Sequence, residues 1–424
     1  MSKRIVLEEL TKVEGHATLA LRVSNGRVDQ CELRTVEGSR YFEGILLRRR
    51  YDEASEIASR ICGICSCAHT VCAIQAIENA LGATVSEQTM DLRTLLTLGE
   101  RIRSHATHLI FFALPDYVGS PSVLTMALER RSELEGGLRL MKAGNEVIRV
   151  VGGRDLHPVS ATVGGFLRVP SAAELDALRI RLERAKPAAL AVAELFNGLP
   201  YPELHHQAEL FSLHSDKEYA ILSGRIRSAD GHFEQEDYDR FLTEYHTPDH
   251  TANFVVREGR TYMVGALSRV ANNLDRLSPD ARRLAEAGPL LRALDNPFHN
   301  NVAQAVELVH CVDEALRILG KLQPRPEPVP TIPLREGRGV AAIEVPRGTL
   351  WHEYVLDSAG YITRANIITP TAQNLRSMEE DLRILLPTVA ALAREEIVAA
   401  AEQLIRSYDP CFSCAAHFLR VKWL

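Results

Sequence analysis

The sequence predicts an α+β protein that is predominantly helical, with a central bundle of long helices, an N-terminal antiparallel sheet and small β insertions. Residues 16–36 alternate apolar and polar side chains around Asn25-Gly26, a pattern typical of a β-hairpin. From Thr70 onward, apolar residues recur three and four positions apart over long segments, which predicts helices that bury one face. We therefore expect a β region in residues 1–50 and a helical bundle after it.

Several segments carry the helical pattern, and each is long enough to form part of a core. They are residues 70–81, 90–114, 173–196, 281–294 and 377–408. Short β-like runs interrupt this pattern between residues 217 and 270, and the proline-rich residues 324–333 predict a stiff connector. We expect the last helix to run almost to Asp409-Pro410, where the proline stops it.

The composition is that of an ordinary globular protein of 424 residues, of which 46% are apolar and 25% charged. The net charge of −6, with cations and acids mixed throughout, gives no broad basic face, so we do not expect nucleic acid as a partner. No apolar run reaches the length of a membrane span, and residues 1–10 lack the apolar region of a signal peptide. We therefore expect a cytoplasmic chain with no direct membrane span.

Two pairs of cysteines have the spacing Cys-x-x-Cys: Cys62 with Cys65, and Cys411 with Cys414. In a large chain without a secretory signal, such pairs favour metal or redox chemistry over a disulfide scaffold. The two pairs bracket the helical region, so a site that they share requires the chain to meet across one core, which favours a single domain over residues 1–424. The cysteines that we interpret as small buried side chains are Cys31, Cys72 and Cys311.

Four cysteines can bind several kinds of metal group. Two Cys-x-x-Cys pairs can make a closed zinc site, and four cysteines can hold an iron–sulfur cluster. Both kinds of site usually draw their ligands from a short stretch of chain, whereas helices separate these two pairs. Four thiolates on a large scaffold also suit a soft transition metal that keeps an open position for chemistry.

Other motifs accompany the cysteines along the chain: "VEGHA", which we expect to lie in the N-terminal sheet, "RICGIC", then "VPRG", "TPT" and "DPCFSCAAH". This set resembles the large, catalytic subunit of nickel–iron hydrogenases over nearly the whole chain. The resemblance implies that each cysteine pair supplies half of one bimetallic site. Cys62 and Cys411 would be terminal ligands of nickel, while Cys65 and Cys414 would bridge nickel to an iron that carries cyanide and carbonyl ligands.

The same resemblance assigns roles to residues around the metals in the heterolytic cleavage of dihydrogen. It implies that the thiolate of Cys411 is the base, with the carboxylate of Glu14 next on the outward proton path. Arg347 matches the arginine suspended over the metals, and Asp409 matches its acidic partner. Thr371 occupies the position that donates a hydrogen bond to a cyanide in the family.

Further positions extend or depart from the family pattern. Glu43 and His417 match the ligands of a separate magnesium or iron site. Ser104 stands where membrane-bound members have a second acid, so we expect a less acidic canopy above the metals. We expect His69 to orient the site by a hydrogen bond rather than to bind metal. For His157 a buried structural role and a functional one are equally supported.

The resemblance is greatest to the cytoplasmic, bidirectional or cofactor-coupled hydrogenases. The chain has no further cysteine set, so we expect no iron–sulfur cluster within it and expect electrons to leave through an iron–sulfur small subunit, docked on an exposed apolar helical face. The acceptor would be a diaphorase that uses NAD(P), a deazaflavin module or a heterodisulfide reductase module. Residues 418–424 match an extension that a maturation endopeptidase removes. The alternatives are a metal-free subunit like those of respiratory complexes and a structural zinc scaffold.

Overall fold

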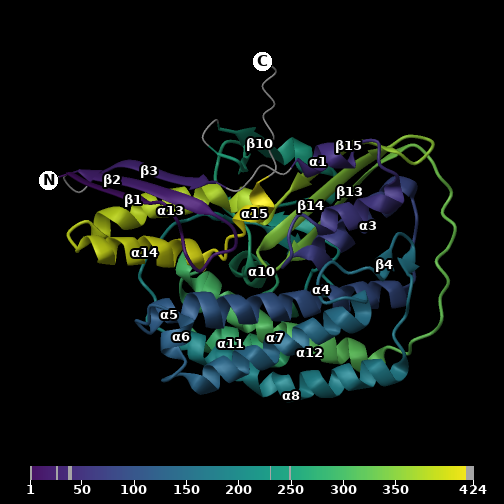
Figure 1. Cartoon of the computed structure of the whole chain (residues 1–424), viewed down its shortest axis with the longest axis horizontal. Helices are drawn as coiled ribbons and strands as arrows, with labels where there is room; N and C mark the ends of the chain where they lie inside the picture. Colours follow the sequence, from purple (N-terminus) through teal and green to yellow (C-terminus); the bar gives the residue numbers. More distant parts are fainter. Residues whose placement is uncertain (1, 25–26, 37–40, 230, 248–249, 417–424) are drawn as a thin grey trace.

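The computed structural model describes residues 2–24, 27–36, 41–229, 231–247 and 250–416. Its largest unit is a bundle of long helices: α4 (Glu87–Thr107), α7 (Arg131–Gly152), α8 (Ala172–Asn197) and α12 (Asn300–Lys321). Helix α4 packs against α7 and α12, and α8 packs against the same two helices, so the four form a closed ring. Figure 1 shows this bundle as one layer below the sheets, which confirms the predicted helical centre.

Helices α4 and α7 approach each other closely because glycines face each other at their crossing. A Cβ atom on Gly144 would lie 2.5 Å from the carbonyl oxygen of Gly99 and 2.7 Å from the backbone nitrogen of Arg103. A larger residue at position 144 would therefore push the helices apart. This close contact sets the position of α4 against α7. Helix α4 supplies several side chains to the site described below.

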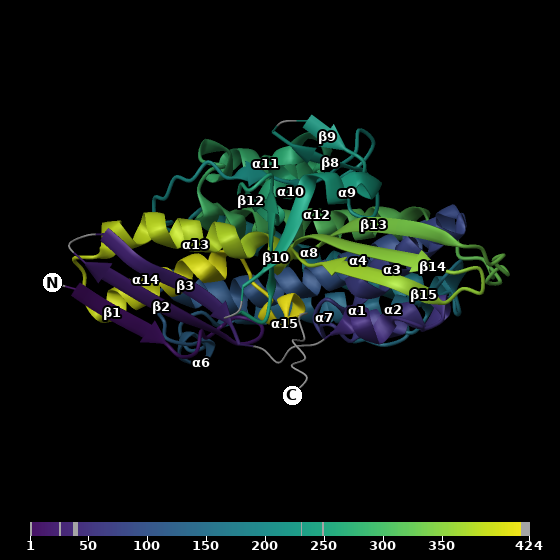
Figure 2. The same ribbon diagram turned by 90° about the horizontal axis from the view of Figure 1, so that it is seen from above.

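Among the described residues, three sheets have three antiparallel strands each: a small one within residues 212–233, and two larger ones that lie above the bundle. The N-terminal sheet contains β1 (Ser2–Leu7), β2 (Ala17–Ser24) and β3 (Arg27–Thr35), as the alternating pattern predicted. The other contains β13 (Gly337–Val345), β14 (Gly348–Leu356) and β15 (Ile362–Ile368), and it packs against α3 (Ser66–Leu81). Figure 2 shows the two sheets at opposite ends of the long axis, with α15 (Phe412–Ala415) between them.

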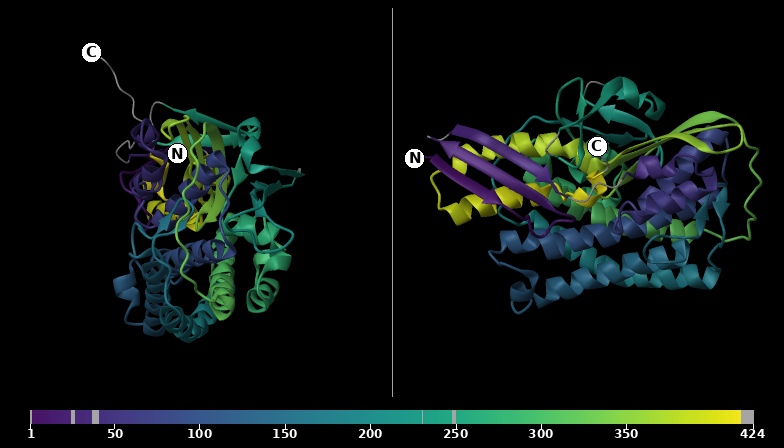
Figure 3. Two further views of the ribbon diagram at one scale, coloured as in Figure 1. Left: turned by 90° about the vertical axis from the view of Figure 1, so that its right-hand side faces the viewer. Right: turned by 45° about the horizontal axis from the view of Figure 1, so that its top comes forward.

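The predicted small β insertions are also present, between residues 217 and 270. They are β8 (Arg225–Ser228), β9 (Gly231–Phe233), β10 (Leu242–His246), β11 (Asn253–Arg257) and β12 (Tyr262–Met263). The end view in Figure 3 shows the layers, with the helix bundle on one side and the sheets on the other. Within the ranges described, no helix is both long and apolar enough to cross a membrane.

The remaining elements are short connections between these layers. The short α-helices are α1 (Phe42–Leu46), α2 (Ala54–Ser59), α5 (Leu114–Tyr117), α6 (Val123–Met126), α9 (Tyr238–Phe241) and α10 (Ala266–Asn272). The 3₁₀ turns are Tyr51–Glu53, Gln235–Asp237, Leu274–Arg276, Leu290–Arg292 and Pro297–His299, and the short strands are β4 (Ala161–Thr162), β5 (Gly165–Phe166), β6 (Glu209–Leu210) and β7 (Ser212–His214).

Two predicted helices were wrong in length. The segment 377–408 is not one helix but parts of two, α13 (Pro370–Val389) and α14 (Arg394–Ser407), which pack against each other. Pro387 removes a backbone donor near the end of α13, which weakens the last turn. The segment 281–294 holds most of α11 (Pro279–Ala287) and the 3₁₀ turn Leu290–Arg292 instead of one helix. Helix α11 stops before Gly288 because the proline that follows this glycine disfavours a helical conformation there.

The predicted helix over residues 90–114 changes its geometry partway along. Helix α4 ends at Thr107, and a π-helical segment, His108–Ala113, continues from it into α5. The wider turn shifts the side chains that follow relative to a continuous α-helix, and such segments often lie near functional sites. The connector over residues 324–333 contains no helix or strand, and its stiffness stays a prediction.

Candidate metal centre

Four cysteine thiols from the two ends of the chain meet in the middle of the molecule. The sulfur atoms of Cys62, Cys65, Cys411 and Cys414 all lie within 4.8 Å of one another, and all four side chains are buried. The sulfurs of Cys62 and Cys411 are 3.6 Å apart, and those of Cys65 and Cys414 are 4.0 Å apart. In the part of the chain that the structure describes, this is the single cluster of three or more cysteine, histidine or acidic side chains close enough to share a metal ion.

Helix α4 holds the N-terminal pair through the backbone. Cys65 is the residue that precedes α3, and the carboxylate of Glu100 accepts hydrogen bonds from the next free amides, Cys67 N at 2.7 Å and Ala68 N at 3.3 Å. An acid at a helix N-terminus satisfies amides that have no partner within the helix. The guanidinium of Arg103 donates to the carbonyl oxygen of Ile64, between the two cysteines, at 2.6 Å.

The C-terminal pair is held by residues that are distant in sequence. The amide of Cys411 donates to the hydroxyl oxygen of Thr371, the second residue of α13, at 2.9 Å. The next amide, Phe412 N, donates to the carbonyl oxygen of Glu14 at 2.8 Å, beside a parallel bridge between Glu14 and Cys411. Asp409 has a φ of 50°, which turns the chain into this position from the end of α14.

Arg347 connects the two pairs from the turn between β13 and β14. Its Nη1 atom lies 3.2 Å from the sulfur of Cys65, and its Nε donates to the carbonyl oxygen of Asp409 at 2.7 Å. Its Nη2 also forms an ion pair with the carboxylate of Asp409 at 3.1 Å, and both side chains are buried. Burial opposes the charge of Arg347, but Asp409 and the neighbouring thiolates raise its pKa well above the usual range.

The pKa shifts of the cysteine thiols indicate that the site is suited to bind a cation. Hydrogen bonds from Cys411, Cys414 and Cys65 hold the pKa of Cys62 well below its usual range. Burial and the charge on their neighbours raise the pKa of Cys411 and of Cys414. Further thiolates therefore form only when positive charge enters the cluster, and a metal ion supplies that charge. Sulfurs this close suit metal–sulfur bonds of about 2.3 Å, which several soft metals make, so the geometry alone does not identify the element.

Glu14 lies beside the C-terminal pair rather than within the sheet. We expected "VEGHA" to belong to the N-terminal sheet, but Glu14 lies in the connection between β1 and β2. The thiol of Cys411 donates to its Oε2 at 2.8 Å, and the hydroxyl of Ser413 lies 2.5 Å from both carboxylate oxygens. The side chain is half-buried, so it spans the distance between the buried sulfur and the surface.

Two histidines near the N-terminal pair have structural partners. The backbone amide of His69 bonds to the carbonyl oxygen of Cys65 at 3.1 Å, and its Nδ1 lies 3.1 Å from Nε2 of His352. His157 donates its amide to the hydroxyl of Ser66 at 3.0 Å, and its Nδ1 lies 2.9 Å from the carbonyl oxygen of Ser59. These contacts tie the loop after α7 to the start of α3.

The other predicted positions lie apart from the sulfur cluster or outside the described residues. Glu43 lies in α1, where burial raises the pKa of its carboxyl to about 7. His417, its expected metal partner, is outside the residues that the structure describes. Ser104 is buried on α4, and its hydroxyl has no hydrogen-bond partner among the residues that the structure describes.

Several residues that support the centre were not predicted from the sequence. Gln304 of α12 donates to the carboxylate of Asp409 at 3.0 Å, and its amide oxygen lies 2.6 Å from Nδ1 of His108. Glu100 and Arg103 are charged residues within a helical pattern, which normally indicates a solvated face. For His108 the sequence held a signal, because it lies four residues after Ser104 and therefore on the same face of the helix predicted over residues 90–114.

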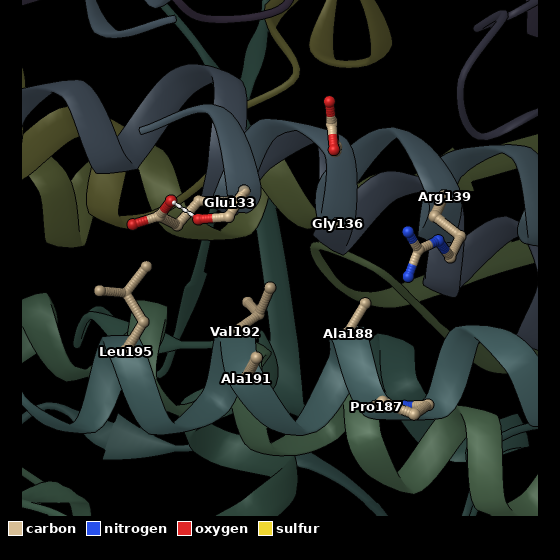
Figure 4. Close-up of a pocket in the computed structure, with 10 residues that line it drawn as sticks. Glu133, Gly136, Arg139, Pro187, Ala188, Ala191, Val192 and Leu195 are labelled. Atoms are coloured by element: carbon tan, nitrogen blue, oxygen red, sulfur yellow. Dashed lines mark hydrogen bonds between the residues drawn. The ribbon is translucent and has the colours of Figure 1, made fainter. Parts of the chain in front are cut away.

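A surface groove of about 370 Å³ lies between α7 and α8 (Figure 4), where Glu133, Gly136 and Arg139 face Ala188, Val192 and Leu195. Neither helix supplies a cysteine or any other predicted site residue. The buried thiol cluster, not an open pocket, is therefore the candidate functional site.

Comparisons with known proteins agree with this location. Residues 40–139 and 293–417 match the family described as nickel-dependent hydrogenase, and the two matched regions contain all four cysteines. Sulfhydrogenase 1 subunit alpha of Pyrococcus furiosus is 35% identical, over 98% of each chain. The NAD-reducing hydrogenase HoxS subunit beta of Cupriavidus necator is 26% identical, over 99% of this chain and 96% of that protein.

Solved structures show the same fold. The structure of an NAD⁺-reducing [NiFe]-hydrogenase in the H₂-reduced state superposes with a TM-score of 0.87 and 26% identity, covering 98% of this chain and 99% of that one. A Ni-Fe-Se hydrogenase from Desulfomicrobium baculatum superposes with a TM-score of 0.81 over 98% of this chain and 100% of that one, at 20% identity. At that identity the second likeness concerns the fold alone.

Proposed function

The chain belongs to the nickel-dependent hydrogenase family as a large subunit, an oxidoreductase that acts on dihydrogen, and from this premise we propose a role for each residue of its metal centre. Cys62 and Cys411 would be terminal ligands of nickel, and Cys65 and Cys414 would bridge nickel to an iron that carries cyanide and carbonyl ligands. When bound, this group supplies the redox chemistry that cleaves dihydrogen heterolytically and reversibly. The observation that carries the proposal is the meeting of four buried sulfurs beside a half-buried carboxylate.

The proton would leave the centre through Cys411 and Glu14. The sulfur of Cys411 lies 2.8 Å from Oε2 of Glu14, within the range for direct proton transfer. The Phe412 amide and the Ser413 hydroxyl hold the backbone and the carboxylate of Glu14 in this position. Since Glu14 is half-buried, it can pass the proton on toward solvent.

Arg347 and Asp409 would position ligands and charge above the metals. The guanidinium is fixed at Nε, Nη1 and Nη2, so its direction cannot vary freely. A fixed cation in a buried site acts strongly on charge that develops nearby. Thr371 already accepts a hydrogen bond from the Cys411 amide, which leaves its hydroxyl proton free to be donated to a cyanide ligand.

A second metal, magnesium or iron, would bind at Glu43 and His417. The support on the Glu43 side is a carboxyl group that burial leaves poorly solvated, which a cation would stabilise in its charged form.

We also propose that an endopeptidase removes residues 418–424 and that residues 1–424 form one domain before this cleavage. Intact-mass measurement on nickel-loaded protein tests the cleavage: a chain that ends at His417 supports it, and an active chain that ends at Leu424 contradicts it.

Electrons would leave through an iron–sulfur small subunit. The names of the relatives, such as sulfhydrogenase subunit alpha and NAD-reducing hydrogenase subunit beta, support a multi-subunit assembly for this chain. We propose a cytoplasmic complex whose acceptor is NAD(P), a deazaflavin or a heterodisulfide reductase module. The very exposed Leu124 on α6 and Leu128 in the turn after it, at 85% and 90%, are apolar side chains well placed to meet a partner.

Elemental analysis tests the proposed centre against its alternatives. We expect about one nickel and one or two iron atoms per chain in protein purified with its partner under anaerobic conditions. Zinc alone would support a structural scaffold, and a chain free of metal that supports quinone reduction would indicate a subunit like those of respiratory complexes. The Cys414→Ser variant is the control, because it should lose nickel and iron but not unrelated surface-bound metal.

The variant Glu14→Gln tests the proton path. The substitution keeps the size of the side chain but removes its ability to accept a proton, so exchange between deuterium gas and water should fall far more than metal content. Glu9→Gln is a suitable control, since Glu9 is exposed and precedes β2 by a few residues. If exchange and turnover in Glu14→Gln match those of the parent protein, Glu14 is not on the path.

A further inference from the structure

A buried cluster of charged side chains lies behind the turn that carries Arg347. Nε and Nη2 of Arg269, on α10, donate to the carboxylate of Glu307, on α12, at 2.5 and 2.7 Å. Nη1 of Arg269 lies 3.1 Å from a carboxylate oxygen of Glu344, on β13, and all three side chains are fully buried. Burial disfavours the charge of Glu307, but Arg269 and Arg101 hold its pKa well below the usual range, so the cluster stays charged.

The guanidinium of Arg269 also binds the two carbonyl groups that precede Arg347. Nη1 donates to the carbonyl oxygen of Val345 at 2.8 Å, and Nη2 donates to that of Pro346 at 2.9 Å. Val345 pairs with Gly348 at the end of the β13–β14 hairpin, so Pro346 and Arg347 form the tight turn between the strands. Arg269 therefore fixes the direction of both peptide groups that lead into Arg347.

The turn also packs against the start of the helix that carries Arg269. Gly348 has a φ of 138°, a conformation that favours glycine. A Cβ atom at this position would lie 2.4 Å from Cγ2 of Val264 and 3.1 Å from the backbone nitrogen of Gly265, which directly precedes α10. The turn is thus held between the residues before α10 and a side chain from the middle of that helix.

Helix α12 supports both ends of the Arg347 residue. Gln304, one helical turn before Glu307, donates to the carboxylate of Asp409, which forms an ion pair with the guanidinium of Arg347. Glu307 holds Arg269, which binds the backbone in front of Arg347. The backbone and the charged end of Arg347 are therefore both positioned from one helix.

We propose that Arg269 is a positioning residue, which directs Arg347 toward the metal centre by holding the two carbonyl groups before it, with Glu307 and Glu344 fixing Arg269 in turn. A buried ion pair is a weak source of stability, because both charges lose their hydration, so the backbone contacts of Arg269 indicate its role better than the pair itself. A small rotation of the turn would move the guanidinium away from the sulfur of Cys65, which lies 3.2 Å from it. The inference rests on the proposed function for its effect on turnover, but not for the restraint on the turn.

The test compares Arg269→Lys with a matched control. Arg269→Lys keeps the charge beside Glu307, but the compact ammonium group cannot bind two acids and two carbonyl groups at once. Arg93→Lys is the control, since Arg93 is also fully buried and binds both carboxylate oxygens of Glu78, at 2.7 and 2.6 Å. The backbone group that Arg93 binds is the carbonyl of Thr162, not the turn before Arg347.

Two measurements separate a positioning role from a merely structural one. Hydrogen–deuterium exchange of the complete complex, followed by mass spectrometry, reports how firmly the backbone amides of residues 347–349 are held. Hydrogen oxidation per nickel is measured for each lysine variant alone and in combination with Arg347→Lys. In such a double-mutant cycle, Arg269→Lys has its effect only while the arginine that it positions is present.

For Arg269→Lys we expect exchange at residues 347–349 to be about tenfold faster and hydrogen oxidation per nickel to be lower by about three- to tenfold, the effect of one hydrogen bond. In the Arg347→Lys background the same substitution should change turnover by less than about twofold. Arg93→Lys should change neither quantity. Unchanged exchange overturns the restraint on the turn, and an equal loss of turnover in both backgrounds overturns the positioning of Arg347. If the parent protein binds no nickel, the proposed function fails, while the exchange comparison still decides the restraint.

Glu344→Gln provides the same test if Arg269→Lys does not assemble into the complex. The amide oxygen can still accept from the Leu213 amide and the Thr349 hydroxyl, but the charge that faces Arg269 is lost. Glu78→Gln is its control. We expect faster exchange at residues 347–349 and lower turnover only in Glu344→Gln, and unchanged exchange or an equal loss of turnover in the Arg347→Lys background would overturn the proposal here too.

Discussion

The two cysteine pairs contribute equal numbers of sulfurs to the centre, but the protein holds them in different ways. The N-terminal pair is bonded through its backbone to one helix, α4, by Glu100 and Arg103. The C-terminal pair is bonded to parts of the chain that lie far apart in sequence, Thr371 and Glu14. One half of the site is therefore built into the helix bundle, whereas the other half forms only when distant segments come together.

Because of this difference, the two pairs should affect different properties: the N-terminal pair the stability of the fold, and the C-terminal pair the assembly of the metal centre. Helix α4 packs in the core of the bundle, so its grip on the N-terminal pair depends on the stability of the fold. The contacts of the C-terminal pair are hydrogen bonds with Thr371 and Glu14, and they set the position of Cys411 and its neighbours. We expect variants of the first set to change the unfolding of the protein and variants of the second set to change metal retention and turnover.

The largest effect is expected when one cysteine of either pair is replaced, so that the pair no longer supplies two sulfurs. In Cys65→Ser and in Cys414→Ser a soft thiolate is replaced by a hard, weakly acidic alcohol, so nickel content and hydrogen oxidation should fall to background in both. Cys311→Ala is the control, because Cys311 is buried in α12 away from the cluster and should retain metal. Full nickel and full activity in either serine variant would contradict the shared site. Metal content by mass spectrometry and gas uptake measure the two quantities.

The second prediction concerns the dependence of stability on pH through Glu100. Burial raises the pKa of this carboxyl to about 7, from 4.5 in the unfolded chain. Between these values the folded protein retains a proton that the unfolded chain has released, so stability falls as the pH rises, by about 3 kcal/mol in total. Glu100→Gln should remove this slope.

Urea unfolding at pH 5 and pH 8 measures the difference, and the exposed Glu87 offers a control as Glu87→Gln on the same helix. Equal changes in the unfolding midpoint of the parent protein and of Glu100→Gln would show that folding does not raise the pKa of Glu100.

The third prediction tests the residue that joins both halves. Arg347→Lys keeps the positive charge but cannot reach Asp409 and Cys65 with three separate donors. We expect turnover per nickel to fall about 10- to 100-fold, the effect of one or two charged hydrogen bonds, with nickel content close to that of the parent protein. Kinetics of hydrogen oxidation, normalised to nickel, check this, and Arg149→Lys on the exposed face of α7 is the control. Unchanged turnover would remove Arg347 from the reaction.

The smallest expected effect concerns Thr371. Thr371→Val keeps the shape of the side chain but leaves the Cys411 amide without its acceptor. We expect a loss of about 1 kcal/mol, seen as faster release of nickel to a chelator rather than as a lower unfolding midpoint. A lower midpoint with normal metal retention would mean that the C-terminal half, too, belongs to the stable core.

The sequence predicted those features that depend on local patterns. The helical bundle and the N-terminal hairpin follow from periodicity, and the four cysteines follow from their spacing. The break between α13 and α14 was missed, because the apolar pattern continues through Pro387 and only packing decides where the chain turns back. Local preference is weak against tertiary contacts of this kind.

The supporting residues of the centre were missed for a different reason. Arg103 and Glu100 occupy a helix whose sequence reads as amphipathic, so their charges indicate a solvated face. Only the close crossing at Gly99 and Gly144 places this part of α4 between two packed layers. A glycine within a helical pattern, such as Gly99, indicates close packing against another helix. Charged residues next to such a glycine are candidates for buried positions, and this signal would have identified Glu100 and Arg103.

The contact between Glu14 and Cys411 has a consequence for the timing of folding. The two residues are 397 positions apart, and Cys414 follows still later in the chain. Contacts between such distant residues form late, because closing a long loop must precede any gain from them. During synthesis the N-terminal pair is complete hundreds of residues before the C-terminal pair exists. A growing chain can therefore display at most half of the ligand set, so premature capture of a metal ion by the complete site is prevented by topology alone.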